Sequence, residues 1–304
     1  MKRPRALRPG DRVAVLAPAS SFDRSVFDQG IIELRTLGFE PVFDESVFER
    51  SSYLAGSPQK RAKAFRTAWK DPSIAGLFTV RGGYGSAQLL PLLDIAELRC
   101  FQKAFLGSSD LTALLICLTN HCETVSFHGP MLVNFAKQIS GYDRSSLLGC
   151  LSVPKPLGEL APDGVEVLKA GEASGMLLGG TLTQLLASLA TPYAFSPPDG
   201  YILLLDDINE RPYRIDRMLT QIQQAGLLRL ASAVVCTEFL GCDDEEQTAK
   251  SILLKILSDF NGPVLFGFPS GHTNRPMLTL PLGVRVTVIS TPYPRLIVEE
   301  AAVE

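Results

Sequence analysis

The chain has 304 residues, enough for two domains of ordinary size, and its composition is that of a globular protein. Hydrophobic residues make up 46% and charged residues 20%, which allows a large core and argues against disorder. The net charge of −3 and the lack of a dense basic cluster argue against nucleic-acid binding, and no apolar run approaches the ~18 residues of a membrane helix. The basic N-terminus precedes an apolar run that is too short for a signal peptide. We therefore expect a soluble cytoplasmic protein with no nucleic-acid or membrane partner.

The first half of the sequence alternates strand patterns with helix patterns. A nearly continuous apolar run at 12–18 predicts a strand buried on both faces, and 23–38 has helical spacing before a glycine. Further strands are expected at 39–44, 74–80 and 103–107, and further helices at 58–70, in part of 86–98 and at 111–120. This alternation predicts a parallel sheet covered by helices.

The second half repeats the α/β pattern after an interval rich in proline and glycine. We interpret that interval, residues 153–175, as the linker between an N-terminal domain of residues 1–152 and a C-terminal domain of residues 176–304. The strands expected in the second half are 200–207, 231–240, 263–272 and 283–291, and the helices are 181–190, 212–228 and 244–260. The expected fold class is therefore α/β in both domains.

Residues that could take part in catalysis or ligand binding follow several of these strands. In an open parallel sheet, ligands bind beyond the carboxyl ends of the strands. The segments at such ends are Arg81–Gly85, Gly107–Asp110, Asp206-Asp207 and the loop that contains His272. A glycine loop lets backbone N–H groups approach a ligand closely, and the other three segments carry side chains that a hydrolase uses.

The segment Gly107-Ser108-Ser109-Asp110 has two interpretations. A serine on a tight turn from strand to helix projects its hydroxyl into a cleft, as a nucleophile does, although Leu111 replaces the last glycine of the G-x-S-x-G pattern. Alternatively, Ser108 or Ser109 caps the helix that follows. These four residues alone favour the cap.

A nucleophilic serine needs a base and an acid. Of the three histidines, His272 lies in a polar loop after a buried strand, His128 ends an apolar strand, and His121 follows a helix end; His272 is the preferred base. Asp206 and Asp207 follow an apolar run, so they either orient a histidine, or cap the following turn or pair with Arg211, Arg214 or Arg217. Serine, aspartate and histidine then occur in one of the chain orders known for hydrolytic triads.

The sequence lacks the patterns of common cofactor sites. Gly82-Gly83-Tyr84-Gly85 matches neither G-x-G-x-x-G nor the P-loop, so dinucleotide or nucleotide-phosphate binding is weakly supported. A backbone N–H of this loop is instead a candidate second oxyanion donor, beside that of Asp110. The six cysteines form no C-x-x-C pair and are expected to be mostly buried and reduced. We expect no cofactor and no metal.

Six segments in order resemble the LD-carboxypeptidases, the muramoyl-tetrapeptide carboxypeptidase family that also contains the microcin C immunity proteins. They span almost the whole chain, and they are LRPGDRVAVLAPAS near the start, RGGYG at 81–85, GSSD at 107–110, LLGGTL at 177–182, PYRIDRML at 212–219 and GHTNRPMLTLPLG at 271–283. The resemblance implies an N-terminal parallel α/β domain of the flavodoxin or Rossmann type, a smaller C-terminal α/β domain, an active site between them, and a homodimer.

The resemblance also implies the roles of individual residues. Ser109 would be the nucleophile, His272 the base, and Asp206 the acid, with the N–H groups of Asp110 and Gly83 as oxyanion donors and Gly82 less favoured. The family usually has glutamate where this chain has Asp206, and a side chain shorter by one methylene loses roughly 1.5 Å of reach. Either the loop has shifted, a water bridges, or activity is impaired. Arg81, Tyr84 and Arg275 are candidates for contacts with the substrate.

Three functions are compatible with this site. The first is a serine carboxypeptidase that releases terminal D-alanine from murein tetrapeptides during peptidoglycan recycling. The second is an immunity-type hydrolase of acyl-sulfamoyl nucleotides, against which the single tryptophan, Trp69, argues mildly because its helix pattern indicates packing rather than base stacking. The third is a binding protein without catalysis on the same scaffold, which the shorter acid keeps open.

Overall fold

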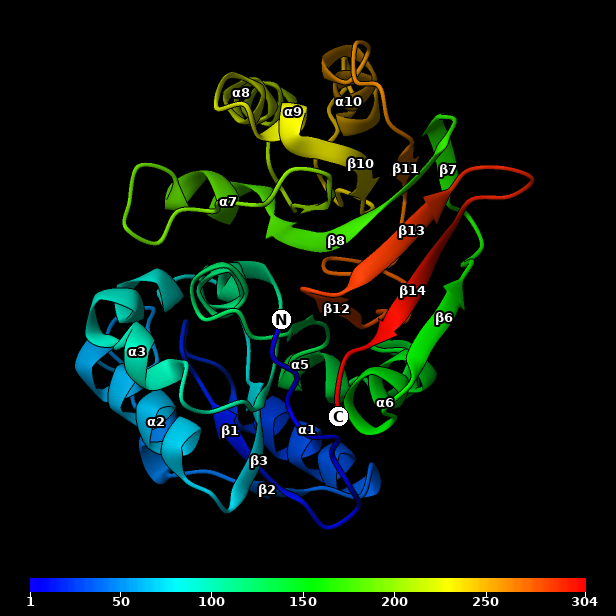
Figure 1. Cartoon of the computed structure of the whole chain (residues 1–304). Coiled ribbons are helices and arrows are strands. Elements are labelled where there is room, and N and C mark those ends of the chain that lie inside the picture. Colours follow the sequence, from blue (N-terminus) through cyan, green and yellow to red (C-terminus); the bar gives the residue numbers. More distant parts are fainter.

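The computed structural model describes residues 1–304 as two lobes, each built around one β-sheet (Figure 1). The first sheet has the strand order β12-β5-β4-β3-β1-β2, and all its neighbours are parallel except β12 with β5. Without β12 the order is that of a flavodoxin-like fold. Its strands are β1 (Arg12–Leu16), β2 (Glu40–Val42), β3 (Ile74–Thr79), β4 (Ala104–Gly107), β5 (Ser126–His128) and β12 (Leu280–Leu282).

Helices cover the first sheet and complete the parallel α/β unit predicted from the sequence. The α-helices are α1 (Arg24–Thr36), α2 (Pro58–Lys70), α3 (Ile95–Leu98), α4 (Thr112–Ile116), α5 (Leu132–Phe135) and α6 (Arg144–Ser152). Short turns of other helix types are η1 (Glu45–Phe48), η2 (Ser86–Leu92), η3 (Ser109–Leu111), η4 (Cys117–His121) and η5 (Gln138–Ser140). The Ser57 side chain caps α2 and a proline begins it, as its sequence predicts.

The second sheet has eight strands in the order β6-β14-β13-β8-β9-β10-β11-β7. Its middle strands, β8 to β11, are parallel, and antiparallel strands flank them. The strands are β6 (Pro156–Leu160), β7 (Glu166–Lys169), β8 (Glu172–Thr181), β9 (Tyr201–Asp206), β10 (Ala231–Cys236), β11 (Val264–Phe266), β13 (Arg285–Ile289) and β14 (Arg295–Ala301); the helices are α7 (Leu182–Ser188), α8 (Pro212–Gln224), α9 (Leu227–Leu230) and α10 (Ala249–Ile256). The α/β fold class is confirmed in both lobes.

Two expectations about the second half need correction. The interval 153–175 is not a linker, because it contains β6, β7 and the start of β8, and only residues 153–155 separate α6 of the first lobe from β6 of the second. The chain later returns to the first sheet for β12 and leaves it again for β13. The expected helix at 244–260 begins only at Ala249. Thr248 caps it, and the Asp244 side chain accepts from the backbone N–H groups of Glu246 and Gln247, which fixes a turn where the acidic residues would have begun the helix.

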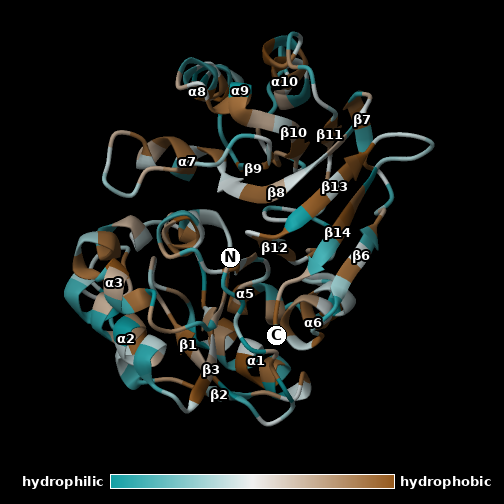
Figure 2. Cartoon of the chain, in the orientation of Figure 1, coloured by the Kyte–Doolittle hydropathy of each residue, from teal (hydrophilic) through white to brown (hydrophobic).

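The core runs through both lobes. Two clusters of buried apolar residues contain most of it, and the larger includes strand residues from both sheets. Figure 2 shows the apolar strands inside and polar faces on outer helices such as α2. The chain ends meet, since Glu304 exchanges backbone hydrogen bonds with Ala6 and Pro4. All six cysteines are free thiols, and only Cys100 is exposed. None of the helices is long and apolar enough to cross a membrane.

Candidate active site

Ser109 lies at the turn between β4 and the helical run of η3 and α4. Its backbone φ is +60°, in the left-handed region that a residue with a side chain rarely adopts, at a cost of about 1–3 kcal/mol. Neither serine caps the helix by its side chain: Ser108 occupies the cap position without a side-chain hydrogen bond, and Ser109 is already the first residue of η3. The geometry is that of a strained elbow which presents the Ser109 hydroxyl.

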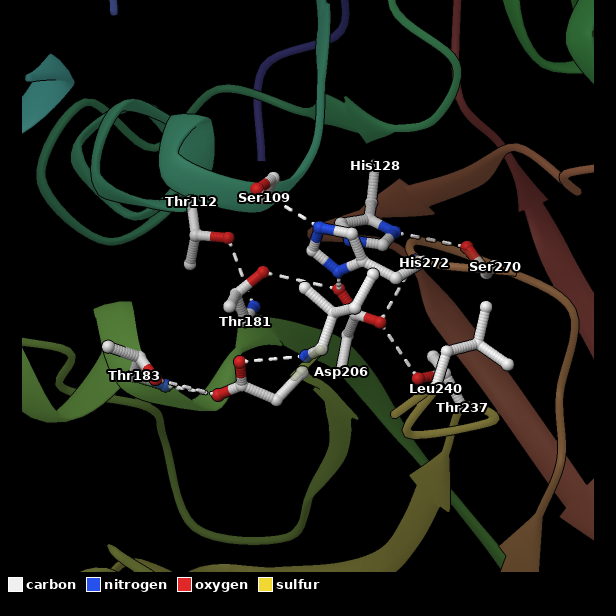
Figure 3. A network of polar contacts seen from close by, with 12 residues as sticks. Ser109, Thr112, His128, Thr181, Thr183, Asp206, Thr237, Leu240, Ser270 and His272 are labelled. Atoms are coloured by element: carbon white, nitrogen blue, oxygen red, sulfur yellow. Dashed lines mark hydrogen bonds and ion pairs between the residues drawn. The ribbon is translucent and has the colours of Figure 1, made fainter. Parts of the chain in front are cut away.

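His272 joins this serine to Asp206 across the two lobes (Figure 3). Its Nε2 lies 3.1 Å from the Oγ of Ser109, and its Nδ1 lies 2.7 Å from the Oδ2 of Asp206. Ser109 follows β4 in the first sheet, whereas Asp206 ends β9 in the second and His272 lies in the loop after β11. The three residues predicted from the sequence are therefore brought together in one hydrogen-bonded chain.

The shorter acid reaches the histidine directly. Asp206 is fully buried, and its carboxylate also accepts hydrogen bonds from the His272 backbone N–H and from the hydroxyls of Thr237 and Thr181. A Cβ at Gly271 would lie only 2.5 Å from the Asp206 Cγ, so glycine lets the loop that carries His272 approach the carboxylate. Of the possibilities left open by the sequence, the structure shows neither a lengthened bond nor a need for a bridging water.

Lengthening this acid is expected to lower activity. Asp206→Glu adds a methylene where Gly271 and two threonine hydroxyls already surround the carboxylate, so overpacking should cost about 1–3 kcal/mol of stability. Displacement of His272 should lower kcat about 10- to 100-fold. Asp207→Glu is the matched control, because that acid is also buried but caps a helix; thermal melts and kcat for both variants check the expectation. An Asp206→Glu enzyme faster than wild type would contradict it.

The charged forms of His272 and Asp206 stabilise each other. Burial alone would lower the pKa of His272, but attraction to Asp206 and their hydrogen bond outweigh it and raise that pKa above its usual value. Burial alone would raise the pKa of Asp206, and the same contacts with His272 bring it below its usual value. Asp206 is thus an anion near neutral pH, and it holds the Nδ1 proton so that Nε2 can accept from Ser109.

The glycine loop after β3 lies against the nucleophile. A Cβ at Gly82 would lie 2.8 Å from the Ser109 Oγ and 3.2 Å from the Asp110 N, so only glycine leaves space beside both atoms. The Gly82 carbonyl accepts from the Ser20 N–H, and the two polar groups of one peptide point in opposite directions. The Gly83 N–H therefore points away from Ser20, which is consistent with its expected role as an oxyanion donor beside Asp110.

The other polar candidates have other partners. Asp207 accepts from the backbone N–H and hydroxyl of Thr183, so it caps α7. His121 contacts the Ala194 carbonyl at a helix end. His128 is fully buried and contacts Ser270 through Nδ1, and burial lowers its pKa to about 4, so it stays neutral beside the site.

The three expected substrate contacts differ in availability. The Arg275 guanidinium is occupied, since it donates to Glu238 and to the carbonyls of Asp163 and Gly267, so we assign it a structural role. Arg81 has no carboxylate partner and donates only to the Ser21 carbonyl. Tyr84 is half exposed and stacks edge-on against Tyr53, with ring centroids 5.8 Å apart.

Sequence reasoning missed the threonines that hold the acid. Thr181 donates two hydrogen bonds: its N–H donates to the hydroxyl of Thr112, the first residue of α4, and its own hydroxyl donates to Asp206. Thr237 follows β10 and donates to the other carboxylate oxygen. Thr181 belongs to the LLGGTL segment, and its position at the end of a strand was the available signal.

Comparison with known proteins gives a consistent result. The LD-carboxypeptidase N-terminal domain model matches residues 13–129, and the C-terminal domain model matches residues 174–288. A putative carboxypeptidase of Streptomyces coelicolor is 34% identical, covering 93% of this chain and 91% of its own. A probable murein peptide carboxypeptidase of Bacillus subtilis is 30% identical, covering 94% and 91%.

Solved structures show the same fold. The muramoyltetrapeptide carboxypeptidase from Oxalobacter formigenes has a TM-score of 0.84 at 28% identity, covering 95% of this chain and 99% of its own. The microcin C7 self-immunity protein MccF, solved in complex with aspartyl sulfamoyl adenosine, has a TM-score of 0.88 at 22% identity, with 100% of both chains covered. The second likeness concerns the fold alone.

Proposed function

Because the chain belongs to the LD-carboxypeptidase family, we propose that this peptidase is a serine enzyme that releases the terminal D-alanine from murein tetrapeptides. The observation that carries the proposal is the continuous chain from Ser109 through His272 to Asp206. The relatives named for murein peptides support the substrate class. The reaction would cleave the bond between an L-centre and the terminal D-residue.

The proposed mechanism follows from the three contacts. The Ser109 Oγ attacks the scissile carbonyl carbon while His272 Nε2 takes the hydroxyl proton, and Asp206 stabilises the imidazolium that forms. The N–H groups of Asp110 and Gly83 would bind the oxyanion. His272 then gives its proton to the amine of departing D-alanine. Water, deprotonated by His272, hydrolyses the acyl-enzyme and restores Ser109.

Arg81 is our candidate for binding a substrate carboxylate. It directly precedes the glycine that touches Ser109, and its guanidinium has no acidic partner in the protein. A guanidinium binds a carboxylate through two parallel hydrogen bonds. Arg275 is not carried into this role, because its donors are used.

A second candidate is hydrolysis of an acyl-sulfamoyl nucleotide. Trp69 is buried and stacked on Phe65, so it is unavailable to a base. The observation that favours this candidate is the exposed pair of Tyr84, in the glycine loop, and Tyr53 beside it, because aromatic rings stack on bases.

Release of D-alanine from L-Ala-γ-D-Glu-meso-diaminopimelyl-D-Ala tests the proposal. We expect release from this peptide and none from the same peptide ending in L-alanine. Cleavage of aspartyl sulfamoyl adenosine instead would favour the second candidate. Tight binding of the tetrapeptide without cleavage of either compound would indicate a binding protein and contradict the proposed activity.

The pH dependence of kcat/KM should reflect the raised pKa of His272. The base must be neutral to accept the Ser109 proton, so activity should fall as pH drops through that pKa, above the usual value of 6.5. A stopped-assay pH profile of the free enzyme checks this, with the melting temperature followed at each pH as the control. An acidic limb centred well below 6.5 would be the opposite result.

The homodimer and the cytoplasmic location stay predictions that rest on the family resemblance and the sequence. Light scattering on the purified chain and fractionation of cells test them. A monomer at micromolar concentration would contradict the first.

A further inference from the structure

Arg61 is a buried cation that contacts no carboxylate. It lies in α2, and its guanidinium donates to the carbonyls of Pro18, Gly56 and Gly85 and to the side chain of Gln88. Only 5% of the residue is exposed. An unpaired buried charge is costly, so a cation that is held only by carbonyl and amide oxygens needs an explanation.

A buried anion lies on the other side of the same loop. The Asp110 carboxylate, which directly follows the nucleophile, accepts from the Ser86 N–H at 2.8 Å and from the Gln184 side chain at 3.2 Å. The Ser86 hydroxyl in turn donates to the Asp110 carbonyl. Only 3% of Asp110 is exposed.

Both charges bind one peptide group. The Gly85 carbonyl, which accepts from Arg61 at 2.8 Å, and the Ser86 N–H, which donates to Asp110, belong to the same planar peptide. The cation therefore faces the negative end of the peptide dipole and the anion faces its positive end. This arrangement is an ion pair with a peptide inserted between the two charges, and each charge partly offsets the burial cost of the other.

The bridged peptide ends the loop that would supply an oxyanion donor. That loop, residues 81–86, is held on its other side by Ser20, which donates its N–H to the Gly82 carbonyl and accepts from the Tyr84 N–H. Arg61 also binds the Pro18 carbonyl in the segment that carries Ser20. One guanidinium thus links both segments that fix the position of Gly83 relative to Ser109.

We propose that Arg61 is a positioning residue of the active site: with Asp110 it holds the Gly85–Ser86 peptide and so sets the distance between the Gly83 N–H and the Ser109 hydroxyl. The inference rests on the proposed serine mechanism. Arg61 does not touch the substrate in this scheme. It acts mainly on the transition state, where the oxyanion forms, and much less on ground-state binding, to which Arg81 of the same loop would contribute.

Lys103 provides a matched control. It is also a buried cation held only by carbonyls, those of Asp71 and Ile74, but it lies at the opposite end of the first sheet, where β3 begins. Arg61→Met and Lys103→Met therefore remove comparable buried charges. They differ in their distance from the glycine loop.

The test compares three variants of the full chain by kcat, KM, melting temperature and affinity for a peptide boronic acid, which mimics the tetrahedral intermediate. We expect Arg61→Met to lower kcat and boronate affinity about 100-fold each, with KM and tripeptide-product affinity changed less than about threefold. Arg61→Lys keeps the charge but not the fork of donors, so about a tenfold loss is expected. Lys103→Met should lower the melting temperature and leave kcat within about twofold of wild type.

Equal losses of kcat in Arg61→Met and Lys103→Met, or parallel losses of boronate and product affinity, would overturn the proposal. If Arg61→Met does not fold, Arg61→Lys carries the same test against Lys103→Met. The rate at which an organophosphonate labels Ser109 also depends on the position of the oxyanion donors relative to the Ser109 hydroxyl, and it is measured without a peptide substrate. A wild type that is labelled but does not cleave murein peptides would refute the proposed substrate, while slower labelling in the Arg61 variants would still support the positioning role.

Discussion

Ser109→Ala is expected to abolish peptide hydrolysis while the folded chain still binds its substrate. Loss of the nucleophile should lower kcat by about 10⁴-fold or more, because the rest of the triad has no group to deprotonate. Alanine meets the same left-handed backbone as serine at this position, so the melting temperature should change little. D-alanine release and calorimetric binding of the tetrapeptide measure the two properties separately.

Ser108 is the control that the chain itself provides. It is the adjacent residue and is buried, but its side chain makes no capping hydrogen bond, and the His272 Nε2 contacts Ser109 instead. Ser108→Ala should keep kcat within a few-fold of wild type. If Ser108→Ala were inactive and Ser109→Ala active, the nucleophile would have been assigned to the wrong serine.

Asp206→Asn should be nearly as damaging, although it changes no side-chain volume. The carboxylate accepts a hydrogen bond from the Nδ1–H of His272, which leaves Nε2 unprotonated and able to accept from Ser109. An amide NH₂ at that position would stabilise the other tautomer, whose Nε2 carries the proton and cannot act as a base. We expect kcat to fall about 10⁴-fold, as such a substitution does in serine proteases.

Asp207→Asn separates this effect from the loss of a buried charge. Asp207 is buried beside Asp206, but its carboxylate caps α7 through Thr183. Its substitution should cost about 1 kcal/mol of stability and leave kcat within about threefold of wild type. Similar kcat values for the two asparagine variants would contradict the assignment of Asp206.

The sequence indicated the residues of the candidate site where a reactive side chain lies at or beyond the end of an apolar strand. Ser109, Asp206 and His272 each come after an apolar strand, and the structure brings them into one chain of hydrogen bonds. The effect of having aspartate rather than the longer glutamate at position 206 could not be predicted from the sequence. Whether aspartate reaches His272 depends on the approach allowed by Gly271, and that distance is set by the packing of two lobes rather than by any local pattern.

The fold was predictable to the extent that its contacts are local in sequence. The parallel strands β1 to β5 and the helices α1 to α4 follow from alternating patterns, whereas α5 and α6 were not expected. The strands β6 and β7 were mistaken for a linker because proline and glycine occur within β6 and on either side of β7 and because both are edge strands, partly exposed to solvent. Strand β12 has only three residues and pairs with β5, far away in the sequence, so no short-range pattern indicates it.

That pairing has a consequence for the order of events during synthesis. The ribosome completes β5 well before β12, and roughly 150 residues at about 5–20 residues per second separate the two, an interval of about 8–30 s. Throughout it, the edge of β5 offers unpaired backbone groups to any neighbouring strand. The newly made first lobe is thus both an incomplete sheet and an incomplete enzyme, and both are completed only when the last part of the chain has emerged.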